Sequence, residues 1–265
     1  MVRECVESLA AWPDHIPVIR AVSQQAALKN QLQTPRGIAM DIEQRVMDEP
    51  FSGSDALIIV DPQIDFCPGG RLQVPEGDTI MAGIAALAPR FQHIVVTQDW
   101  HPAGHLSFAS SHLDRQPFDV IAMPYGDQVL WPDHCIQGTP GAEFHPDVLG
   151  AVERAHLIIR KGYNPEVDSY SAFFENDQTT RTGLAGYLRD KEVRRCVFVG
   201  LAYDFCVAWS ALDARREGFE ACILKEYTRA IGMPVQGGTS VDIAEAQFRE
   251  RNVRLVSSTN AQHRS

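Results

Sequence analysis

The sequence predicts an α/β fold: a doubly wound, mostly parallel, six-stranded sheet with helices on both faces. Short runs of consecutive apolar residues, each of strand length, recur along the chain from Ala56 onward. Segments with apolar residues at helical spacing separate these runs, and this alternation is typical of right-handed βαβ crossovers. Several runs end directly in a charged residue, which indicates strands whose carboxyl ends share one edge of the sheet.

Residues 1–54 differ from the regular part of the chain, and we expect them to form a partly helical N-terminal extension. Residues 20–32 and 38–47 have helical character, but their apolar faces are thin. Residues 51–54 have the composition of a linker, so the predicted domain spans residues 55–265. Met40 and Met47 stand just upstream of this linker. We hypothesise that the native chain starts at one of them.

The six predicted strands are continuous apolar runs of the kind that is buried on both faces of a parallel sheet. They cover residues 56–60, 93–98, 156–160, 196–200, 221–224 and 253–256. Helical spacing marks the segments between them, around residues 80–87, 184–188, 206–218 and after a capping signal formed by Thr239 and Asp242. Residues 100–155 form a long stretch without a regular pattern.

The segment around Cys206 combines a strand, a short turn and a helix. Arg215, Arg216 and Gly218 end this helix with cations and a glycine, so Cys206 lies at its N-terminus. There, unpaired N–H groups and the positive end of the helix dipole favour a thiolate over a thiol. A free cysteine taken alone is more often a small buried hydrophobe, so other features must decide its role.

Four chemically active residues come from four separate strand units. Asp61, Asp99, Lys161 and Cys206 each lie at or just beyond the carboxyl end of a predicted strand. Open α/β sheets bind ligands at this edge. Residues 100–155 leave from the same edge, and their Pro, Gly, His and aromatic residues can form the walls of a site.

Bulk composition limits the classes of function. With 265 residues, of which 45% are hydrophobic and 22% charged, the chain can bury a full core. A net charge of -10 argues against a nucleic-acid partner, which requires a clustered basic surface. No apolar stretch reaches the roughly 18 residues of a membrane span, and no signal-peptide core is present, so we expect no membrane partner and a cytoplasmic location. In that setting the six cysteines are expected to be reduced.

The first group that suggests chemistry is Asp61, Lys161 and Cys206. It offers a carboxylate to take a thiol proton, a cation that favours both carboxylate and thiolate, and a nucleophilic sulfur. A structural ion pair between Asp61 and Lys161 is the alternative interpretation.

The second group is Asp99, His101 and His134, with His105 nearby. A carboxylate with two imidazoles suits Zn²⁺, Fe²⁺ or Mn²⁺ and leaves coordination positions open. A hydrogen-bonded structural role is the alternative for any single histidine. Together at the ligand-binding edge, these residues favour a metal.

Five motifs follow one another in register between about Ala56 and Ser257. They read Val60-Asp61-x-Gln63-x-Asp65-Phe66-Cys67-Pro68-Gly69-Gly70, Thr97-Gln98-Asp99-Trp100-His101-Pro102-x-x-His105-x-Ser107-Phe108, Trp131-Pro132-x-His134-Cys135-x-x-Gly138-Thr139-Pro140-Gly141-Ala142, Lys161-Gly162, and Gly200-Leu201-Ala202-x-Asp204-x-Cys206-Val207. Together they resemble the nicotinamidase branch of the isochorismatase-like cysteine hydrolases.

This resemblance implies an isochorismatase-like fold and hydrolysis of nicotinamide, and usually also pyrazinamide, to the acid and ammonia. It implies that Cys206 is the nucleophile, that Asp61 is the general base and acid, and that Lys161 holds both in their charged forms. The backbone N–H groups of Ala202 and Cys206 would form the oxyanion hole, with a cis peptide bond between Leu201 and Ala202.

The resemblance also implies one divalent metal ion, bound by Asp99, His101 and His134. Zinc is the first expectation, with iron or manganese as alternatives, and the metal would take the pyridine nitrogen of the substrate. His105 is a ligand in some members only, so its role stays open. The aromatic positions implied to line the ring pocket are Phe66, Trp131 and Tyr170. A role in pyridine nucleotide salvage is expected, and a homo-oligomer is left open.

Ile64, Tyr203 and Phe205 depart from the residues usual in this family, which leaves the preference among substituted pyridines open. Three alternatives to the nicotinamidase hypothesis remain. The chain could hydrolyse another small amide, it could use a metal-bound hydroxide with a purely structural Cys206, or it could be a non-catalytic pyridine-binding protein.

Overall fold

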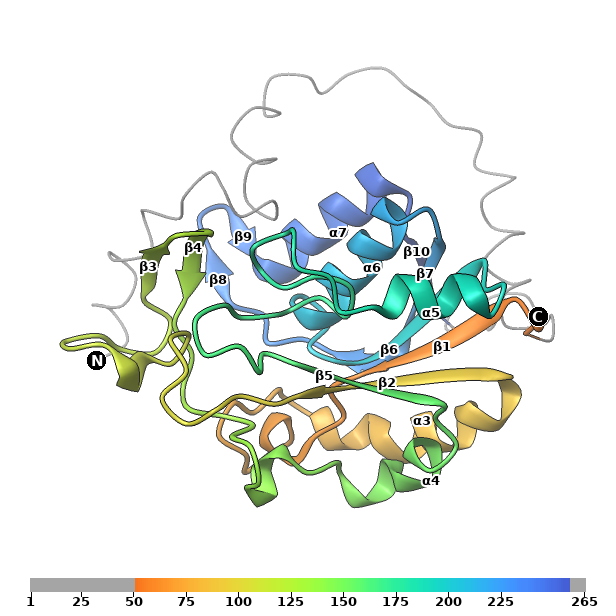
Figure 1. Ribbon diagram of the computed structural model, residues 1–265, viewed down its shortest axis with the longest axis horizontal. Helices are drawn as coiled ribbons and strands as arrows, with labels where there is room; N and C mark the ends of the chain where they lie inside the picture. The colour runs from red at the N-terminus through yellow and green to blue at the C-terminus, as the bar shows by residue number, and fades with distance from the viewer. Residues whose placement is uncertain (1–50, 258–265) are drawn as a thin grey trace, which may run out of the picture.

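The computed structural model describes residues 51–257, which form three layers with a β-sheet in the middle (Figure 1). All neighbouring strands of this six-stranded sheet are parallel. The predicted α/β sheet is confirmed. Its strands are β1 (Asp55–Val60), β2 (His93–Asp99), β5 (Leu157–Lys161), β6 (Arg195–Leu201), β7 (Glu220–Arg229) and β10 (Arg254–Val256).

Helices cover both faces of the sheet, as predicted. In Figure 1, α3 (Met81–Leu87) and α4 (Leu149–Val152) lie below the sheet, and α5 (Leu184–Asp190), α6 (Cys206–Arg216) and α7 (Ser240–Arg251) lie above it. Short 3₁₀ helices occupy Ile64–Phe66, Gly77–Ile80, Ala88–Arg90, Ala109–Ser111, Pro140–Ala142 and Pro146–Val148.

Two small hairpins were not predicted. Strands β3 (Val120–Met123) and β4 (Gly126–Val129) pair within the stretch that showed no regular pattern, and β8 (Pro234–Val235) pairs with β9 (Gly238–Thr239) before α7. Strands of two to four residues are too short for a sequence period to reveal.

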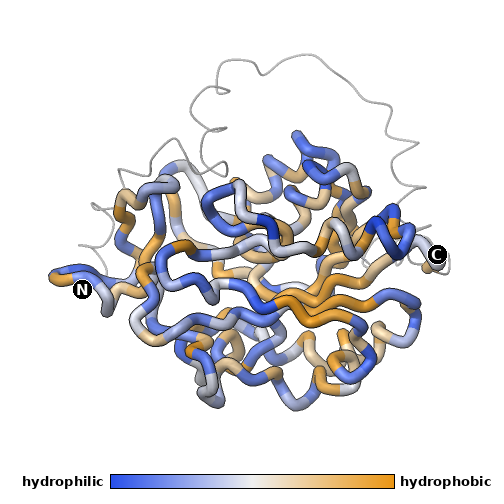
Figure 2. Tube along the Cα trace, viewed as in Figure 1, coloured by the Kyte–Doolittle hydropathy of each residue, from blue (hydrophilic) through white to orange (hydrophobic). Residues whose placement is uncertain are grey.

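The central strands are buried because their sequences are apolar without interruption. Every residue of β1 is buried, and the tube coloured by hydropathy is most apolar along the middle of the sheet (Figure 2). A strand with helices on both faces has no solvent side, so alternation with polar residues would place polar groups in the core. The continuous apolar run is therefore what positions β1 in the centre.

The strand order creates a crevice at the centre of the sheet. The order is β10-β7-β6-β1-β2-β5, so the chain builds outward from β1 to β5 and then crosses back to β6 on the other side of β1. The carboxyl ends of β1 and β6 are neighbours whose connections leave toward opposite faces. Ligands of open α/β sheets bind at such a switch point.

Helix boundaries follow their local signals. The Thr239 side chain accepts a hydrogen bond from the Asp242 N–H, and the Asp242 carboxylate accepts one from the Thr239 N–H, which is the predicted capping box. Helix α6 begins at Cys206, and Gly218, with φ of +90°, follows its end.

The predicted extension, its helical segments and the two candidate start methionines lie outside the described residues, apart from residues 51–54. Within that short piece, the Phe51 ring stacks on Phe91 with centroids 4.0 Å apart. In the part of the chain that the structure describes, no helix has both the length and the apolar character needed to cross a membrane.

Candidate active site

The four predicted strand-end residues meet at the switch point. Asp61 directly follows β1, Asp99 and Lys161 are the last residues of β2 and β5, and Cys206 is the first residue of α6 after β6. Asp61 adopts a left-handed backbone conformation with φ of +44°, which is uncommon for a residue other than glycine. The short turn at each strand end thus places a functional group in the crevice.

Lys161 is the centre of this cluster. Its ammonium nitrogen lies 2.8 Å from Asp61 Oδ2, 2.9 Å from Asp99 Oδ1 and 3.5 Å from Cys206 Sγ. It also donates to the Ser169 carbonyl at 3.0 Å. Burial alone would lower the pKa of this amine, but Asp61 and Asp99 together raise it well above its usual value. Lys161 is therefore a permanent cation.

Asp61 is completely buried. Its Oδ1 accepts a hydrogen bond of 2.6 Å from the Thr97 hydroxyl, while Oδ2 is ion-paired with Lys161 at 2.8 Å. Burial raises the pKa of this carboxyl, and the Lys161 charge offsets only part of the rise. A buried carboxyl with a raised pKa is suited to exchange a proton.

Cys206 differs from the sequence expectation in one respect. Its position at a helix N-terminus beside a lysine predicts a stabilised thiolate, yet the pKa of the thiol is raised well above its usual value. Burial is the largest cause, because loss of hydration destabilises the thiolate more than the Lys161 charge stabilises it. The Asp61 charge raises the pKa further. Burial thus opposes the thiolate that the helix position and Lys161 favour, and a base that takes the thiol proton would overcome this opposition.

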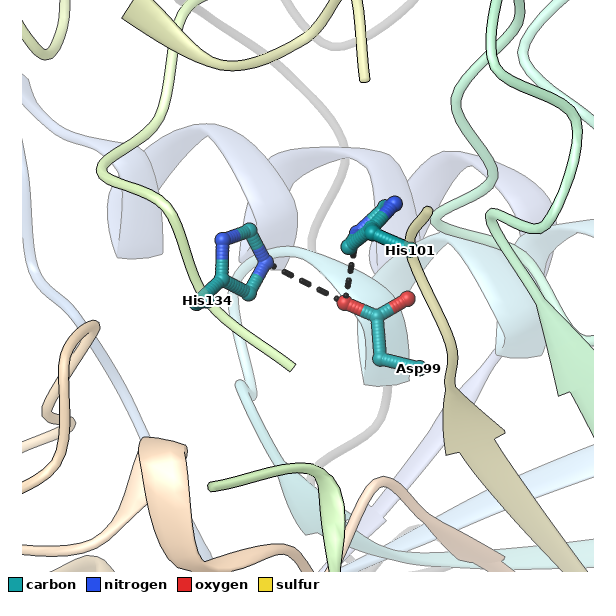
Figure 3. Close-up of side chains that lie close together, drawn as sticks. All are labelled: Asp99, His101 and His134. Atoms are coloured by element: carbon teal, nitrogen blue, oxygen red, sulfur yellow. Dashed lines mark hydrogen bonds and ion pairs between the residues drawn. The ribbon is translucent and has the colours of Figure 1, made fainter. Parts of the chain in front are cut away.

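Asp99, His101 and His134 form a compact cluster beside this group (Figure 3). Asp99 Oδ2 lies 3.0 Å from His101 Nε2 and 3.2 Å from His134 Nε2, and all three residues are buried. Burial would raise the pKa of Asp99, but the His101 and Lys161 charges hold it well below its usual value. The carboxylate is ionised.

Hydrogen bonds of the two imidazoles fix which nitrogen faces Asp99. His101 Nδ1 bonds the Gly162 carbonyl at 2.9 Å, and His134 Nδ1 bonds the Pro132 carbonyl at 2.8 Å. Because carbonyls only accept, each Nδ1 carries a proton, and each ring turns its Nε2 toward the Asp99 carboxylate. Two imidazole Nε2 atoms and a carboxylate oxygen that converge in a buried site could together bind a divalent cation, and the Nδ1 contacts are the orienting bonds that metal-binding histidines make.

Gly162 allows this arrangement. Its φ is +67°, and a Cβ atom there would lie 2.4 Å from Cε1 of the His101 ring. Any other residue would push the imidazole away from Asp99. The small residue after Lys161 is therefore required by the histidine and not only by the turn.

His105 is held differently from the other two histidines. The backbone N–H of Ser107 donates to its Nδ1 at 3.0 Å, so in the neutral ring the proton is on Nε2. His105 forms a second group with His101 and Asp168, whose possible ligand atoms lie within 4.8 Å of one another. In this tautomer His105 offers that group an N–H donor and not a lone pair.

The turn after β6 presents two backbone donors. The peptide bond between Leu201 and Ala202 is cis, as the family resemblance implied. Among the hydrogen bonds of the described residues, none is donated by the Ala202 or Cys206 N–H group. Both N–H groups are thus available to an oxygen atom placed beside Cys206 Sγ.

A narrow cavity joins the two groups. It is lined by Cys206 and Ala202, by the cluster of Asp99, His101 and His134, and by several apolar or aromatic side chains. Asp61 and Lys161 are buried and do not line it. Trp131 Nε1 donates to the Tyr170 hydroxyl at 3.0 Å. The remaining lining residues are Phe66, Leu72, Trp131, Asp168, Tyr170, Phe205 and Ile231. All three predicted ring-pocket residues are among them.

Sequence analysis missed several supporting residues. Gln63 clamps the backbone of Asp99, since its Nε2 donates to the Asp99 carbonyl at 2.8 Å and its Oε1 accepts from the Asp99 N–H at 2.7 Å. Gln63 and Thr97 both stand in the quoted motifs, so a signal was present. Ile231 lies in no motif, and only the fold brings it to the cavity.

The chain is similar to known proteins across its described domain. Residues 55–233 match the model of the isochorismatase domain family. A nicotinamidase of Acinetobacter baylyi is 48% identical over 205 residues, which cover 77% of this chain and 93% of that protein.

Two solved structures are similar in fold and sequence. One is described as an Acinetobacter baumanii nicotinamidase and pyrazinamidase, with 46% identity and a TM-score of 0.74 over 79% of this chain and 99% of that chain. The other is a pyrazinamidase of Pyrococcus horikoshii in complex with zinc, with 35% identity and a TM-score of 0.60 over 77% of this chain and 99% of that one.

Proposed function

The chain belongs to the isochorismatase family, and we propose that it is a nicotinamidase, a cysteine amidohydrolase that converts nicotinamide to nicotinate and ammonia. Pyrazinamide is the expected second substrate. This proposal rests on the contacts of one buried lysine, Lys161, with Asp61, Asp99 and Cys206. Cys206 lines a cavity that is also lined by Asp99, His101 and His134.

The reaction begins with proton transfer from Cys206 to Asp61. The raised pKa values of both groups support this assignment, because the thiol holds its proton at rest and the carboxylate is basic enough to take it. The thiolate then attacks the carboxamide carbon. The oxyanion accepts hydrogen bonds from the Ala202 and Cys206 N–H groups, each of which contributes on the order of 3 kcal/mol to the transition state.

The second half of the reaction uses the same carboxyl. Asp61 returns the proton to the amide nitrogen, the C–N bond breaks, ammonia leaves and a thioester remains on Cys206. Asp61 then accepts a proton from the attacking water, and collapse of the second tetrahedral species releases nicotinate and restores the thiol. Lys161 stays charged throughout the reaction and stabilises the negative charge, whether it is on Asp61 or on Cys206.

Asp99, His101 and His134 are the residues that we propose bind one divalent metal ion, whereas His105 is not a ligand. A bound ion would supply a Lewis-acid position for the pyridine nitrogen and so orient the ring. Zinc is proposed because two imidazoles and a carboxylate form a set that it prefers and because the similar Pyrococcus pyrazinamidase is in complex with zinc.

Phe66, Trp131 and Tyr170 are proposed to enclose the pyridine ring. The cavity measures about 20 Å³, little more than the roughly 10–15 Å³ that one water needs, so these side chains must move apart when substrate enters. Trp131 and Tyr170 are in edge-on contact, with ring centroids 6.0 Å apart.

The first test measures ammonia release from nicotinamide by the purified protein and by Cys206→Ala. We expect turnover by the parent and its loss in the variant, with a thioester detectable by mass spectrometry after rapid acid quench. Full activity of Cys206→Ala would replace the covalent route by metal-bound hydroxide. No turnover by a folded, metal-loaded parent would redirect the search to other small amides and then to a binding protein.

The second test concerns the metal. We expect about one ion per chain by elemental analysis and loss of nicotinamide turnover after chelation, with recovery on adding Zn²⁺, Fe²⁺ or Mn²⁺. The ion that restores most activity identifies the metal. Unchanged turnover in protein shown to be metal-free would refute the metal site.

A further inference from the structure

One buried glutamine of the β3–β4 hairpin holds two side chains that line the proposed active-site cavity. Gln128 lies on β4, outside the motifs of the sequence, and is only 1% exposed. The hairpin stands outside the central sheet, at the left of Figure 1. Most of its other residues are half-buried. A fully buried polar side chain on such a strand requires hydrogen-bond partners.

The amide of Gln128 is fully engaged. Its Nε2 donates to Tyr170 Oη at 2.9 Å and to Asp168 Oδ2 at 3.2 Å, and also to the backbone carbonyl of the next residue at 2.7 Å. Its Oε1 accepts from the Tyr125 hydroxyl and from Asn176 Nδ2, both at 3.2 Å. A glutamine amide has two N–H donors and two acceptor lone pairs, so these contacts use all of them.

Tyr170 is held through Gln128 at two points. Its hydroxyl oxygen accepts N–H groups from Gln128 and from Trp131 Nε1, the latter at 3.0 Å. Its backbone N–H donates to Oδ1 of Asn176 at 3.0 Å, and Asn176 in turn donates to Gln128. Tyr170 and Trp131 both line the cavity, so the hairpin glutamine is joined to the aromatic wall.

The place of the Tyr170 ring decides the shape of that wall. Its centroid lies 6.0 Å from that of Trp131, 6.1 Å from that of Phe205 and 5.7 Å from that of Trp209, always edge-on. The hydroxyl is the polar end of an otherwise apolar side chain, and its two N–H donors fix where this end lies. A wall fixed in this way holds a flat ring in one orientation, which a carboxamide needs to meet the nucleophile.

The catalytic group depends much less on the same contacts. The segment that contains Asp168 and Tyr170 reaches Lys161 only through the Ser169 carbonyl, which accepts from the lysine at 3.0 Å. Asp61 and Asp99 hold the lysine at 2.8 and 2.9 Å without any help from the hairpin. Loss of the glutamine contacts should therefore disturb the ring wall and leave the ion pairs in place.

We propose that Gln128 is a positioning residue for the substrate, which fixes Tyr170 and Asp168 in the cavity wall and thereby sets the affinity for the pyridine ring. Chemistry at Cys206 does not depend on it. This inference rests on the proposed nicotinamidase function, because it concerns the ring that nicotinamide carries. It also gives the β3–β4 hairpin a role in substrate binding.

The test compares steady-state ammonia release by the full chain and by Gln128→Met, in which an unbranched apolar side chain replaces the amide. We expect KM for nicotinamide to rise about tenfold, because Tyr170 loses one of its two donors, while kcat stays within about threefold of the parent value. Ile121→Ala is the matched control, since Ile121 lies opposite Gln128 on β3 and makes none of these hydrogen bonds. Its KM should stay within about twofold of the parent value.

Tyr170→Phe supplies a measurement that a purely structural role would not change. It removes the hydroxyl through which Gln128 is proposed to act, so adding Gln128→Met to it should raise KM by less than about threefold. An equal rise of KM in both backgrounds would overturn the proposal. The same holds if kcat falls as much as KM rises, or if Ile121→Ala has the effect of Gln128→Met.

Thermal melting identifies a variant that does not fold. Gln128→Glu then takes the place of Gln128→Met, because it keeps the Oε1 acceptor for Tyr125 and Asn176 and removes only the N–H donors. A similar rise in KM is expected, and an unchanged KM overturns the proposal. A folded, metal-loaded parent that releases no ammonia from nicotinamide would refute the proposed function and this inference together. Parent turnover with an unchanged KM in the folded variants would refute the inference alone.

Discussion

At the scale of single residues, burial shifts the pKa values of the group that we propose is catalytic. Lys161 is 1% exposed and Asp61 is fully buried, so each charge depends on its partner and not on water. Removing the lysine would leave two buried carboxylates facing each other, and breaking such a pair typically costs about 3–5 kcal/mol. The same burial that raises the thiol pKa makes the neighbouring carboxylate a stronger base.

Asp61→Asn tests the role of this carboxyl. We expect kcat for nicotinamide to decrease by about 10²–10⁴-fold, because the thiol then has no base, while KM changes little. Steady-state kinetics of ammonia release measure both values. Asp114→Asn, at an exposed loop position, serves as the control. A kcat close to that of the parent would place the base elsewhere.

Gly162→Ala tests the fit between the glycine and His101. The added methyl group would meet the imidazole ring, so we expect affinity for the metal to decrease by about 10–100-fold. Gly138→Ala is the matched control, because Gly138 has a φ of +74° but open space around it. Competition with a chromogenic chelator measures both affinities. An equal loss in the two variants would mean that backbone strain, and not the His101 contact, is responsible.

Asp213 predicts a pH dependence of stability. Burial raises its pKa from 3.8 to about 6, so the folded state favours the protonated form. The free energy of unfolding therefore contains a favourable contribution below pH 3.8 that is lost as pH rises through 6, on the order of 3 kcal/mol in total. Asp213→Asn should melt at a higher temperature than the parent at pH 7 but not near pH 4. A difference that is the same at both pH values would contradict this origin.

At the scale of elements, the turn between β6 and α6 also positions a wall of the cavity. Asp204 lies in this turn and is 1% exposed. Its carboxylate accepts hydrogen bonds from the Ile231 N–H at 3.0 Å, the Gly232 N–H at 2.8 Å and the Ser240 hydroxyl at 2.5 Å. Ile231 lines the cavity, so one buried carboxylate connects the turn before Cys206 to the segment after β7.

Asp204→Ala should therefore alter substrate binding more than chemistry. We expect KM for nicotinamide to increase several-fold with a smaller change in kcat, and stability to fall by about 1–3 kcal/mol because buried N–H groups lose their acceptor. Asp242→Ala is the control, since it breaks the cap of α7 on the same segment but leaves Asp204 in place. If Asp242→Ala raises KM equally, general loosening of the segment explains the effect.

At the scale of the whole molecule, the strand order decides where the site forms. β1 and β6 are neighbours only because the chain crosses back after β5, and their ends supply Asp61 and the turn before Cys206. A Cβ on Gly200 would lie 2.1 Å from the Val60 carbonyl oxygen, so this position must be glycine for β6 to pack against β1.

We propose that the catalytic domain begins near residue 55, so residues 1–50 should be dispensable for turnover. All strands of the central sheet and all proposed site residues lie within residues 51–257. A chain that starts at residue 51 should keep the melting temperature and kcat of the full chain within about twofold in rate. Differential scanning calorimetry and ammonia release would measure this. Loss of folding or of kcat would assign the N-terminal residues a part in the domain.

Much of the fold and site was predictable because the signals are local. The six strands follow from uninterrupted apolar runs, the start of α7 follows from its capping residues, and the functional edge follows from charges at strand ends. The short hairpins were not predictable because strands of two to four residues show no period. The place of Ile231 was not predictable because it depends on segments far apart in the chain that meet only after folding.

The sequence by itself determined the elements, the edge at which they end and the chemistry available there, since periodicity and residue type act within a few positions of the chain. Only the tertiary structure decided the strand order, the lysine's simultaneous contacts and the proton-bearing nitrogen of each histidine. It alone also raised the Cys206 pKa, against the prediction from its helix position, and formed a second cavity that Trp209 lines. These properties depend on burial and on contacts across the sheet, which no local pattern encodes.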